Sequence, residues 1–220
     1  MRNIVRVPSL CLWLAACPAL AQTPWYVGAS AGQSAIDASS GEIESGFLVD
    51  DAFTAAGTTL DRRDTGWKLY GGYRFNEVFA AEAGYVDLGK ASFNTTIVDA
   101  PAGTSPTPPF PINATATARG VFLSALAQWP LVHGFSVFAK AGAFRSEAEF
   151  TERITTTGAT RVARTQRRTD ANYGIGVRWA FTDRLSARLE LERFRKVGRG
   201  IGGREGRDVD FASVGVVVQF

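Results

Sequence analysis

Cysteine, histidine and methionine are scarce in this 220-residue chain, which has two, one and one of them. Both cysteines, Cys11 and Cys17, lie near the N-terminus. A chain cleaved after Ala21 would therefore have neither a disulfide framework nor thiol chemistry. One histidine without a retained cysteine does not supply the usual ligands of a zinc site. We expect no metal site and no cofactor.

The first residues are typical of an export signal. Arg2 and Arg6 form a short basic region, Val7 to Ala16 is mostly apolar, and Ala19-Leu20-Ala21 matches a cleavage site. We expect residues 1–21 to be a signal peptide and residues 22–220 to be one mature domain. Leu14-Ala15-Ala16-Cys17 also matches a lipoprotein cleavage box, which would instead leave a lipidated Cys17.

A strong net charge is missing too. The formal charge is +3, and it falls to +1 once Arg2 and Arg6 are removed, so nothing indicates a nucleic-acid partner. After residue 21 no stretch has 18 consecutive apolar residues, which excludes a transmembrane helix. A soluble periplasmic protein is still compatible with these two absences.

What the sequence does contain is alternation with a period of two, as in Gly66–Phe75 and Leu185–Glu192. This period predicts strands. Short turns alternate with long loops rich in Gly, Ser, Thr, Pro and charge, which is typical of an outer-membrane barrel. The eight expected strands are residues 25–34, 66–75, 78–89, 119–131, 135–146, 170–181, 184–197 and 208–220.

The two faces of these strands favour a membrane barrel over a soluble β-sandwich. The apolar faces carry aromatic residues near the strand ends, among them Trp25, Trp67 and Trp179, as interfacial girdles do. The opposite faces are rich in glycine, which a narrow lumen requires. We predict an all-β, eight-stranded, antiparallel, up-and-down transmembrane β-barrel in the outer membrane of a Gram-negative bacterium, with both termini in the periplasm.

The chain ends on "SVGVVVQF", with Phe220, Val218 and Val216 on one face and Gly215 five residues before the end. This resembles the terminal-strand signal that the outer-membrane assembly machinery reads. We therefore expect Gly215, Val218 and Phe220 to act as an assembly signal and that machinery to be a partner.

Several stretches together resemble the transmembrane domain of the outer membrane protein A family. They are "WYVGASAG", "GYRFNEVFAAEAGYVDLG", "FSVFAKAGAFRS", "YGIGVRWAFTDRLSARLELERF" and "GVVVQF". The resemblance covers all the expected strands and none of the loops. Larger members continue into a peptidoglycan-binding domain, and because this sequence stops at Phe220 we expect no tethering through such a domain.

Glu82 lies within an otherwise apolar strand, and its parity places it in the lumen, with Phe79, Ala81 and Tyr85 facing lipid. Opposite charges confined there must pair. Arg188 and Lys140 are the expected partners of Glu82. The resemblance implies a salt-bridge network at Glu82, Arg178 and Arg188, although better-known members carry an acid where Arg178 stands. The full set with inward parity is Lys68, Arg74, Glu82, Lys140, Arg178, Arg188, Glu190 and Glu192.

Motifs that would indicate an enzyme have simpler explanations. Gly28–Gly32 matches G-x-S-x-G but lies within a strand, where the nucleophile elbow requires a strand-to-helix turn. Gly198–Gly203 matches G-x-G-x-x-G, yet a strand follows it instead of a helix. Small barrels that deacylate lipid A use a His/Ser pair near the outer leaflet, whereas His133 lies in a turn at the opposite end. We expect no catalytic site.

Arginines near the outer strand ends, Arg145, Arg193 and Arg195, have lipid-facing parity and are expected to contact lipopolysaccharide phosphates. Two functions from different classes stay open. The first is a structural barrel, a monomer in outer-membrane lipid, whose long loops mediate surface adhesion or host contact. The second is a narrow porin-like channel or a conduit for small molecules.

Overall fold

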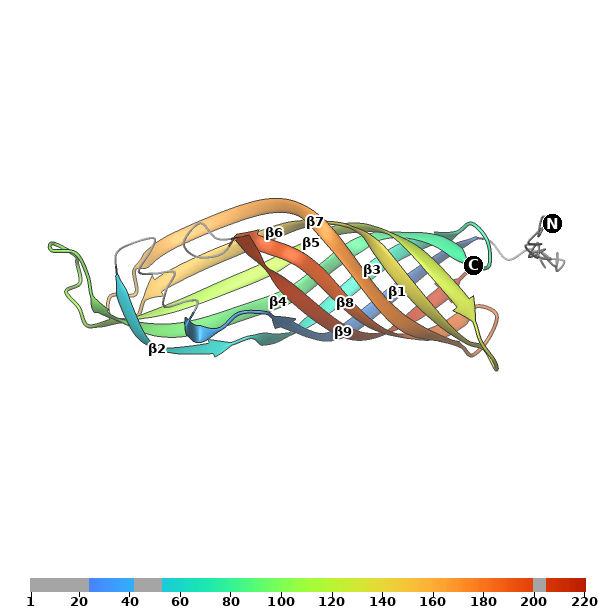
Figure 1. Ribbon diagram of the computed structural model, residues 1–220, viewed down its shortest axis with the longest axis horizontal. Coiled ribbons are helices and arrows are strands. Elements are labelled where there is room, and N and C mark those ends of the chain that lie inside the picture. The colour runs from blue at the N-terminus through green and yellow to red at the C-terminus, as the bar shows by residue number, and fades with distance from the viewer. Residues whose placement is uncertain (1–23, 42–52, 200–204) are drawn as a thin grey trace, which may run out of the picture.

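The computed structural model describes residues 24–41, 53–199 and 205–220. The signal peptide expected at residues 1–21 lies outside these ranges, as does most of the Gly198–Gly203 motif. No helix among the described residues is long and apolar enough to cross a membrane. The fold is an antiparallel sheet of nine strands, eight of which close into a ring (Figure 1). The strands are β1 (Trp25–Ile36), β2 (Thr54–Asp61), β3 (Arg63–Arg74), β4 (Phe79–Asp99), β5 (Phe110–Pro130), β6 (Phe135–Ile154), β7 (Thr160–Ala180), β8 (Leu185–Arg199) and β9 (Glu205–Gln219).

The ring closes where the first and last strands meet. β1 pairs with β3 on one side and with β9 on the other, and β4 pairs with β5, so the eight strands leave no free edge. The ninth strand, β2, pairs with Ser92–Asp99 of β4, whereas β3 pairs with Ala80–Asp87 of the same strand. β2 therefore prolongs the wall built by β3 and is not a ninth stave of the ring.

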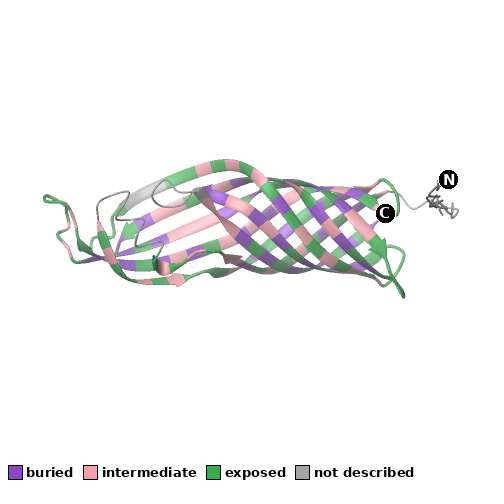
Figure 2. Cartoon of the chain, in the orientation of Figure 1, coloured by how far each residue is buried: buried purple, intermediate pink, exposed green. Residues whose placement is uncertain are grey.

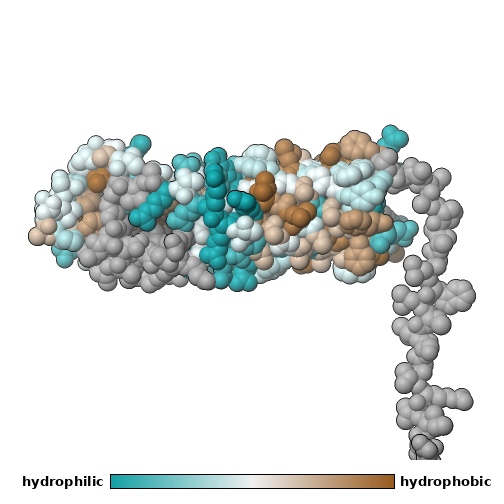
Figure 3. Space-filling view, turned by 90° about the horizontal axis from the view of Figure 1, so that it is seen from above, coloured by the Kyte–Doolittle hydropathy of each residue, from teal (hydrophilic) through white to brown (hydrophobic). Residues whose placement is uncertain are grey.

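One end of the barrel carries the short turns and the other carries the long connections (Figure 1). The turn end holds residues 75–78, 131–134 and 181–184, the start of β1 and the end of β9. The loop end holds residues 100–109, residues 155–159 and β2. The outer surface changes along this axis, with apolar residues gathered toward the turn end and hydrophilic residues around the middle (Figure 3).

Burial alternates along each strand, so each strand has one face toward the lumen and one face outward (Figure 2). In the turn-end half of β5 the outward residues are Val121, Leu123, Ala125, Ala127 and Trp129. These five positions cover nine residues, the length that a tilted strand needs to cross a bilayer. The expected assignment of outward and inward faces is confirmed in this part of the barrel.

A polar belt ends this apolar zone. On every strand of the ring, the first outward residue that follows the apolar zone in the direction of the loop end is polar or charged. The belt consists of Gln33, Thr65, Asp87, Arg119, Arg145, Thr169, Arg193 and Asp210. Cross-strand pairs such as Asp87 with Arg119 and Arg193 with Asp210 place these residues at one level.

The strands do not stop at the belt, and here the expected strand bounds were wrong. β4, β5, β6 and β7 run for 20 or 21 residues, and they include most of the residues expected to be loops at 90–118 and 147–169. A bilayer requires only about ten residues per strand. The remainder extends the barrel beyond the apolar zone, in segments whose content of Gly, Ser, Thr, Pro and charge had indicated loops.

The extension has a hydrophobic core of its own. Phe93 and Ile97 of β4 pack with Phe110 and Ile112 of β5 and with Ile154 of β6. A separate cluster, including Phe144, Phe194 and Phe211, fills the lumen at the level of the belt. Apolar side chains therefore pack inside the barrel both at the belt and beyond it.

Two bulges lie at the belt. The register of β4 shifts between Asp87 and Lys90, where Gly89 has a φ of 73°, a conformation that favours glycine. The amide of Gly89 donates to Asp87 (2.8 Å) and the amide of Lys90 donates to Asp64 (2.8 Å). β8 shifts in the same way between Phe194 and Val197. These irregularities occur where the wall passes from its apolar zone to the extension.

Two lumen glycines make room for aromatic rings. The ring of Tyr70 lies across Gly28 and the ring of Tyr26 lies across Gly72, so a Cβ atom at either glycine would overlap the ring. Gly71, the neighbour of Gly72, faces outward, and its nearest atom would be the Tyr26 carbonyl oxygen at 3.9 Å.

We predict that Gly72→Ala destabilises the barrel by about 1–3 kcal/mol, because the lumen is already filled and Tyr26 must move. Gly71→Ala adds the same methyl group on the outer face and should leave stability nearly unchanged. Denaturant unfolding in detergent, followed by the mobility of unheated samples on gels, measures both. Equal stabilities of the two variants would contradict the filled lumen.

Candidate functional site

The lumen contains a buried cluster of charged residues from β3, β4, β6 and β8. Glu82 and Arg188 form a two-pronged pair, with Arg188 Nη1 at 2.5 Å from Glu82 Oε1 and Nη2 at 3.2 Å from Oε2. Glu82 is 1% exposed and Arg188 is 6% exposed. The hydroxyl of Tyr26 donates to the same Glu82 oxygen at 2.9 Å.

Two glutamates and two lysines form the rest of the cluster. Lys68 contacts Glu190 at 2.8 Å and Glu192 at 2.6 Å. Lys140 contacts Glu192 at 2.5 Å and also pairs with Glu190. Each glutamate therefore bridges the two lysines, which come from strands on different sides of β8 in the ring.

The cluster is neutral. Its acids are Glu82, Glu190 and Glu192 and its bases are Lys68, Lys140 and Arg188, so three negative charges face three positive ones. Arg188 also lies 3.4 Å from Glu190 and thereby joins the two halves. We call these six residues the lumen network. Such pairing is what burial requires, because an unpaired charge in a dry site costs several kcal/mol.

Neutral polar groups extend the lumen network to other strands. Asn172 of β7 donates to Glu192 at 3.3 Å and to Ser124 of β5 at 3.0 Å. With Tyr26 of β1, seven of the eight strands of the ring contribute to these contacts. Tyr26, Asn172 and Ser124 were not among the expected site residues, although their inward parity could have identified them.

Aromatic rings surround the bases. The guanidinium of Arg188 lies 4.1 Å from the ring centre of Phe138, and Lys140 lies 5.2 Å from that of Phe122. Such cation–π contacts stabilise a cation that has lost its water. The lumen network is thus walled by Phe122 and Phe138 as well as by its own counter-charges.

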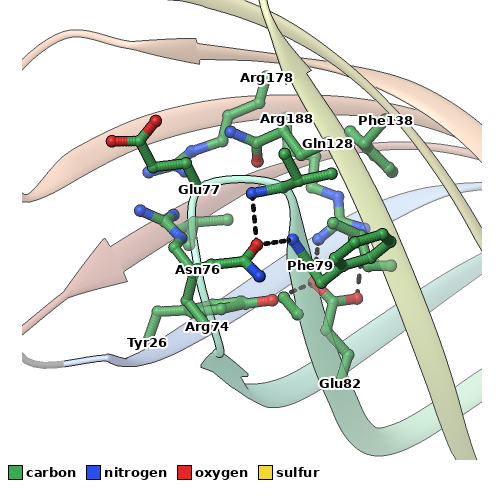
Figure 4. Close-up of a pocket in the computed structure, with 14 residues that line it drawn as sticks. Tyr26, Arg74, Asn76, Glu77, Phe79, Glu82, Gln128, Phe138, Arg178 and Arg188 are labelled. Carbon is green, nitrogen blue, oxygen red and sulfur yellow. Dashed lines mark hydrogen bonds and ion pairs between the residues drawn. The ribbon is translucent and has the colours of Figure 1, made fainter. Parts of the chain in front are cut away.

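Arg74 and Arg178 line a pocket beside the lumen network, with Glu82 and Arg188 also in its lining (Figure 4). The expectation placed them among paired lumen charges, but neither forms an ion pair with a carboxylate among the described residues. Nε of Arg178 donates to the Ser186 hydroxyl at 2.8 Å, and Arg74 lies 6.0 Å from the ring centre of Tyr26. Glu82 pairs directly with Arg188, whereas Lys140, the other expected partner, contacts Glu190 and Glu192 instead.

The three rim arginines have different surroundings. Arg193 holds Asp210 in a two-pronged pair, both distances being 2.6 Å, and Arg195 lies 3.2 Å from Asp208. Arg145 is exposed in the polar belt, opposite Thr169 of β7. Two of the three guanidinium groups therefore already have carboxylate partners on β9.

Beyond the belt, charged pairs form on the outer wall. Arg167 lies 2.9 Å from Glu147, and Arg119 lies 3.5 Å from the same carboxylate. The hydrogen bond from Arg167, assisted by Arg119, holds the pKa of the Glu147 carboxyl below its usual value. This pair is exposed, so its contribution to stability is small.

The terminal strand lies as expected within the sheet. Val216, Val218 and Phe220 are exposed on the outer face, and Gln219 is buried in the lumen. Gly215 lies directly against β1, where a Cβ atom would meet the Ala29 carbonyl and Ser30. Their use as an assembly signal stays a prediction.

The motifs that were expected not to form a catalytic site lie in strands and turns. Gly28–Gly32 lies within β1, and His133 lies in the turn between β5 and β6 with a φ of 55°. Within the described ranges, no three histidine, cysteine or acidic residues are placed to hold a metal ion.

Comparison with known proteins places this architecture in a family. The model of the OmpA-like transmembrane domain matches residues 20–220. The chain belongs to this family. Outer membrane protein A of Klebsiella pneumoniae is 25% identical over 200 residues, which are 89% of this chain and 51% of that protein. The chain thus spans about half the length of this relative.

Solved structures of small barrels are similar to this one. Ail of Yersinia pestis, solved with the heparin analogue sucrose octasulfate, has a TM-score of 0.49 and 14% identity, over 89% of this chain and 97% of that one. OprG of Pseudomonas aeruginosa has a TM-score of 0.49 and 10% identity, over 90% and 98%. The β-barrel domain of OprF from the same species has a TM-score of 0.47 and 13% identity, over 91% and 100%. The family match over residues 20–220, together with the closed ring of strands, identifies this OmpA-like chain as an outer-membrane β-barrel.

We predict that Glu82→Ala lowers the free energy of unfolding by about 3 kcal/mol, because it leaves Arg188 buried without its main partner. Glu149→Ala, which removes an exposed carboxylate from the outer wall, should change it by no more than about 0.5 kcal/mol. Chemical denaturation in detergent measures both variants. If Glu82 were a hydrated side chain, its variant would unfold like the wild type.

The coupling of this pair is measured by the Glu82→Ala/Arg188→Ala double variant. The double variant should lose less free energy of unfolding than the two single variants lose together, because it leaves neither charge without its partner. Strict additivity would show that the two residues act independently.

Proposed function

We propose that the protein is a structural component of the outer membrane whose lumen is closed and whose loop end is displayed at the cell surface. The observation that carries this proposal is the neutral lumen network, which ties the strands together across the interior. The belt and the long extension support the orientation, since the zone sized for lipid lies toward the turn end. In this arrangement the turn end and both termini face the periplasm.

The extension supports a role in surface contact. It raises the loop end well beyond the apolar zone and carries exposed arginines, including Arg153, Arg164 and Arg167. Such side chains suit an anionic surface or host ligand. The chain needs no catalytic group for this role, and we propose none.

A narrow channel or a conduit for small molecules is the alternative. It would require the lumen network to separate or rearrange, because Lys68, Glu82 and Arg188 occupy the path along the axis. The packed side chains at the belt would have to move as well. The closed barrel is therefore the function we favour.

Partners in the envelope follow from the outer surface. We propose that Arg145 is the residue that contacts lipopolysaccharide phosphate, since Arg193 and Arg195 are held by Asp210 and Asp208. Arg145→Gln should reduce the lipopolysaccharide that copurifies with the protein, whereas Arg195→Gln should reduce it less. If both variants retained the same amount of lipopolysaccharide, Arg145 would have no special role in binding it.

Surface display can be tested with single cysteines, because we expect the mature chain to have no free thiol. Ala102→Cys lies at the loop end and Asp183→Cys lies in a turn at the other end. A membrane-impermeant maleimide applied to intact cells should label the first and spare the second. Label on the second but not on the first would reverse the orientation, and label on both in intact cells would contradict the integral barrel.

The assembly signal can be tested in the same cells. Deleting Phe220 should reduce labelling at Ala102→Cys, because fewer molecules reach the membrane. Gln219→Ala, which faces the lumen, should reduce it less. Equal labelling in the two variants would argue against a signal on the outer face of β9.

A further inference from the structure

The turn end of the lumen opens into a pocket that the lumen network does not fill. Tyr26, Arg74, Glu82, Gln128, Arg178 and Arg188 are among its lining residues. Its volume, about 20 Å³ counted at the centres of water molecules, is room for one or two waters. We call it the mouth pocket.

The charges of the lumen network cancel, but those of the other residues that line the mouth pocket do not. Every base of the lumen network contacts a carboxylate, and its three acids cancel its three bases. Arg74 and Arg178 add two further positive charges, and neither has an ion pair within the described parts of the chain. Both side chains are partly buried, so solvent screens them less than it screens surface arginines.

Arg178 lies in a particularly unfavourable position. It is directly opposite Arg188 across β7 and β8, and like charges in that relation destabilise a sheet. Glu82 and Glu190 neutralise Arg188. Among the residues that the structure describes, Arg178 donates a side-chain hydrogen bond only to neutral Ser186, through Nε, so its two terminal nitrogens are available as donors.

One carboxylate faces the two arginines. Glu77, in the turn between β3 and β4, lines the pocket on the same side as Arg74 and Arg178, while Glu82 and Arg188 lie on the other side (Figure 4). Glu77 is exposed and is not within ion-pair distance of either arginine. The single negative charge of Glu77 offsets only one of the two positive charges, so Arg74, Arg178 and Glu77 together have a net positive charge.

We propose that the mouth pocket binds a compact oxyanion, phosphate in particular, between the guanidinium groups of Arg74 and Arg178. Guanidinium groups bind phosphate oxygens through paired, charge-assisted hydrogen bonds. A bound phosphate would offset the positive charge that Glu77 leaves unbalanced, and its oxygens would take the places of the one or two waters for which the pocket has room. The phosphate is either a free ion or the head of a phospholipid.

The direct test is a titration of the purified, folded protein in a neutral detergent with inorganic phosphate at constant ionic strength, followed by calorimetry and by the melting temperature. The wild type should bind phosphate and melt at a higher temperature when it is present. The Arg74→Gln/Arg178→Gln variant should bind it roughly tenfold or more weakly, because charge-assisted hydrogen bonds are lost. This variant should still fold, since it removes like charges from the mouth.

Two matched variants separate the site from general electrostatics. Arg184→Gln removes one positive charge from an exposed turn at the same end, outside the pocket, and should leave phosphate binding unchanged. Glu77→Gln removes the opposing carboxylate and should tighten phosphate binding.

The source of the phosphate is tested by adding phosphatidylglycerol to the micelles. The added lipid should weaken the binding of inorganic phosphate if lipid phosphate occupies the site, and should leave that binding unchanged if the ligand is free phosphate. Absence of phosphate binding by the wild type, or an equal loss in Arg184→Gln, would overturn the proposal.

Discussion

The pairing of charges inside the barrel is the interaction on which the rest of this structure depends. A closed ring of eight strands leaves a narrow interior in which acids and bases cannot reach bulk water. Lys68 and Lys140 each contact two glutamates, and Arg188 joins Glu82 to Glu190. Removing any one of these six side chains leaves one buried charge in excess, so the network holds strands together that the backbone ladder alone does not connect.

The outer surface divides the barrel into two parts. Up to the polar belt the wall meets the requirements of lipid, with apolar residues outward and the network within. Beyond the belt the same strands continue with threonine, asparagine and charge outward, and Phe93, Ile97, Phe110 and Ile112 fill the interior. The extension is thus stabilised as a water-exposed β-structure with its own core, and it lifts the loops away from the apolar zone.

Much of this could be predicted from the sequence, and the failures have physical causes. Side-chain parity placed Glu82 and Arg188 in the lumen because a strand alternates strictly. Parity does not report depth, so the separation of Arg74 and Arg178 from the network could not be anticipated. The extension was missed because its segments are rich in Gly, Ser, Thr, Pro and charge, a composition shared with loops, although threonines such as Thr95 and Thr117 also favour strands. The pairing of Arg193 with Asp210 depends on the register of β8 and β9, which a single sequence does not give.

The central claim is that the neutral network closes the lumen, and single-channel recording in planar bilayers tests it most directly. The account predicts that the refolded wild-type protein produces no steady ion-conducting steps, and that Glu82→Ala produces them, because water can then enter around Arg188. Steady conductance by the wild-type protein, unchanged in Glu82→Ala, would contradict the account.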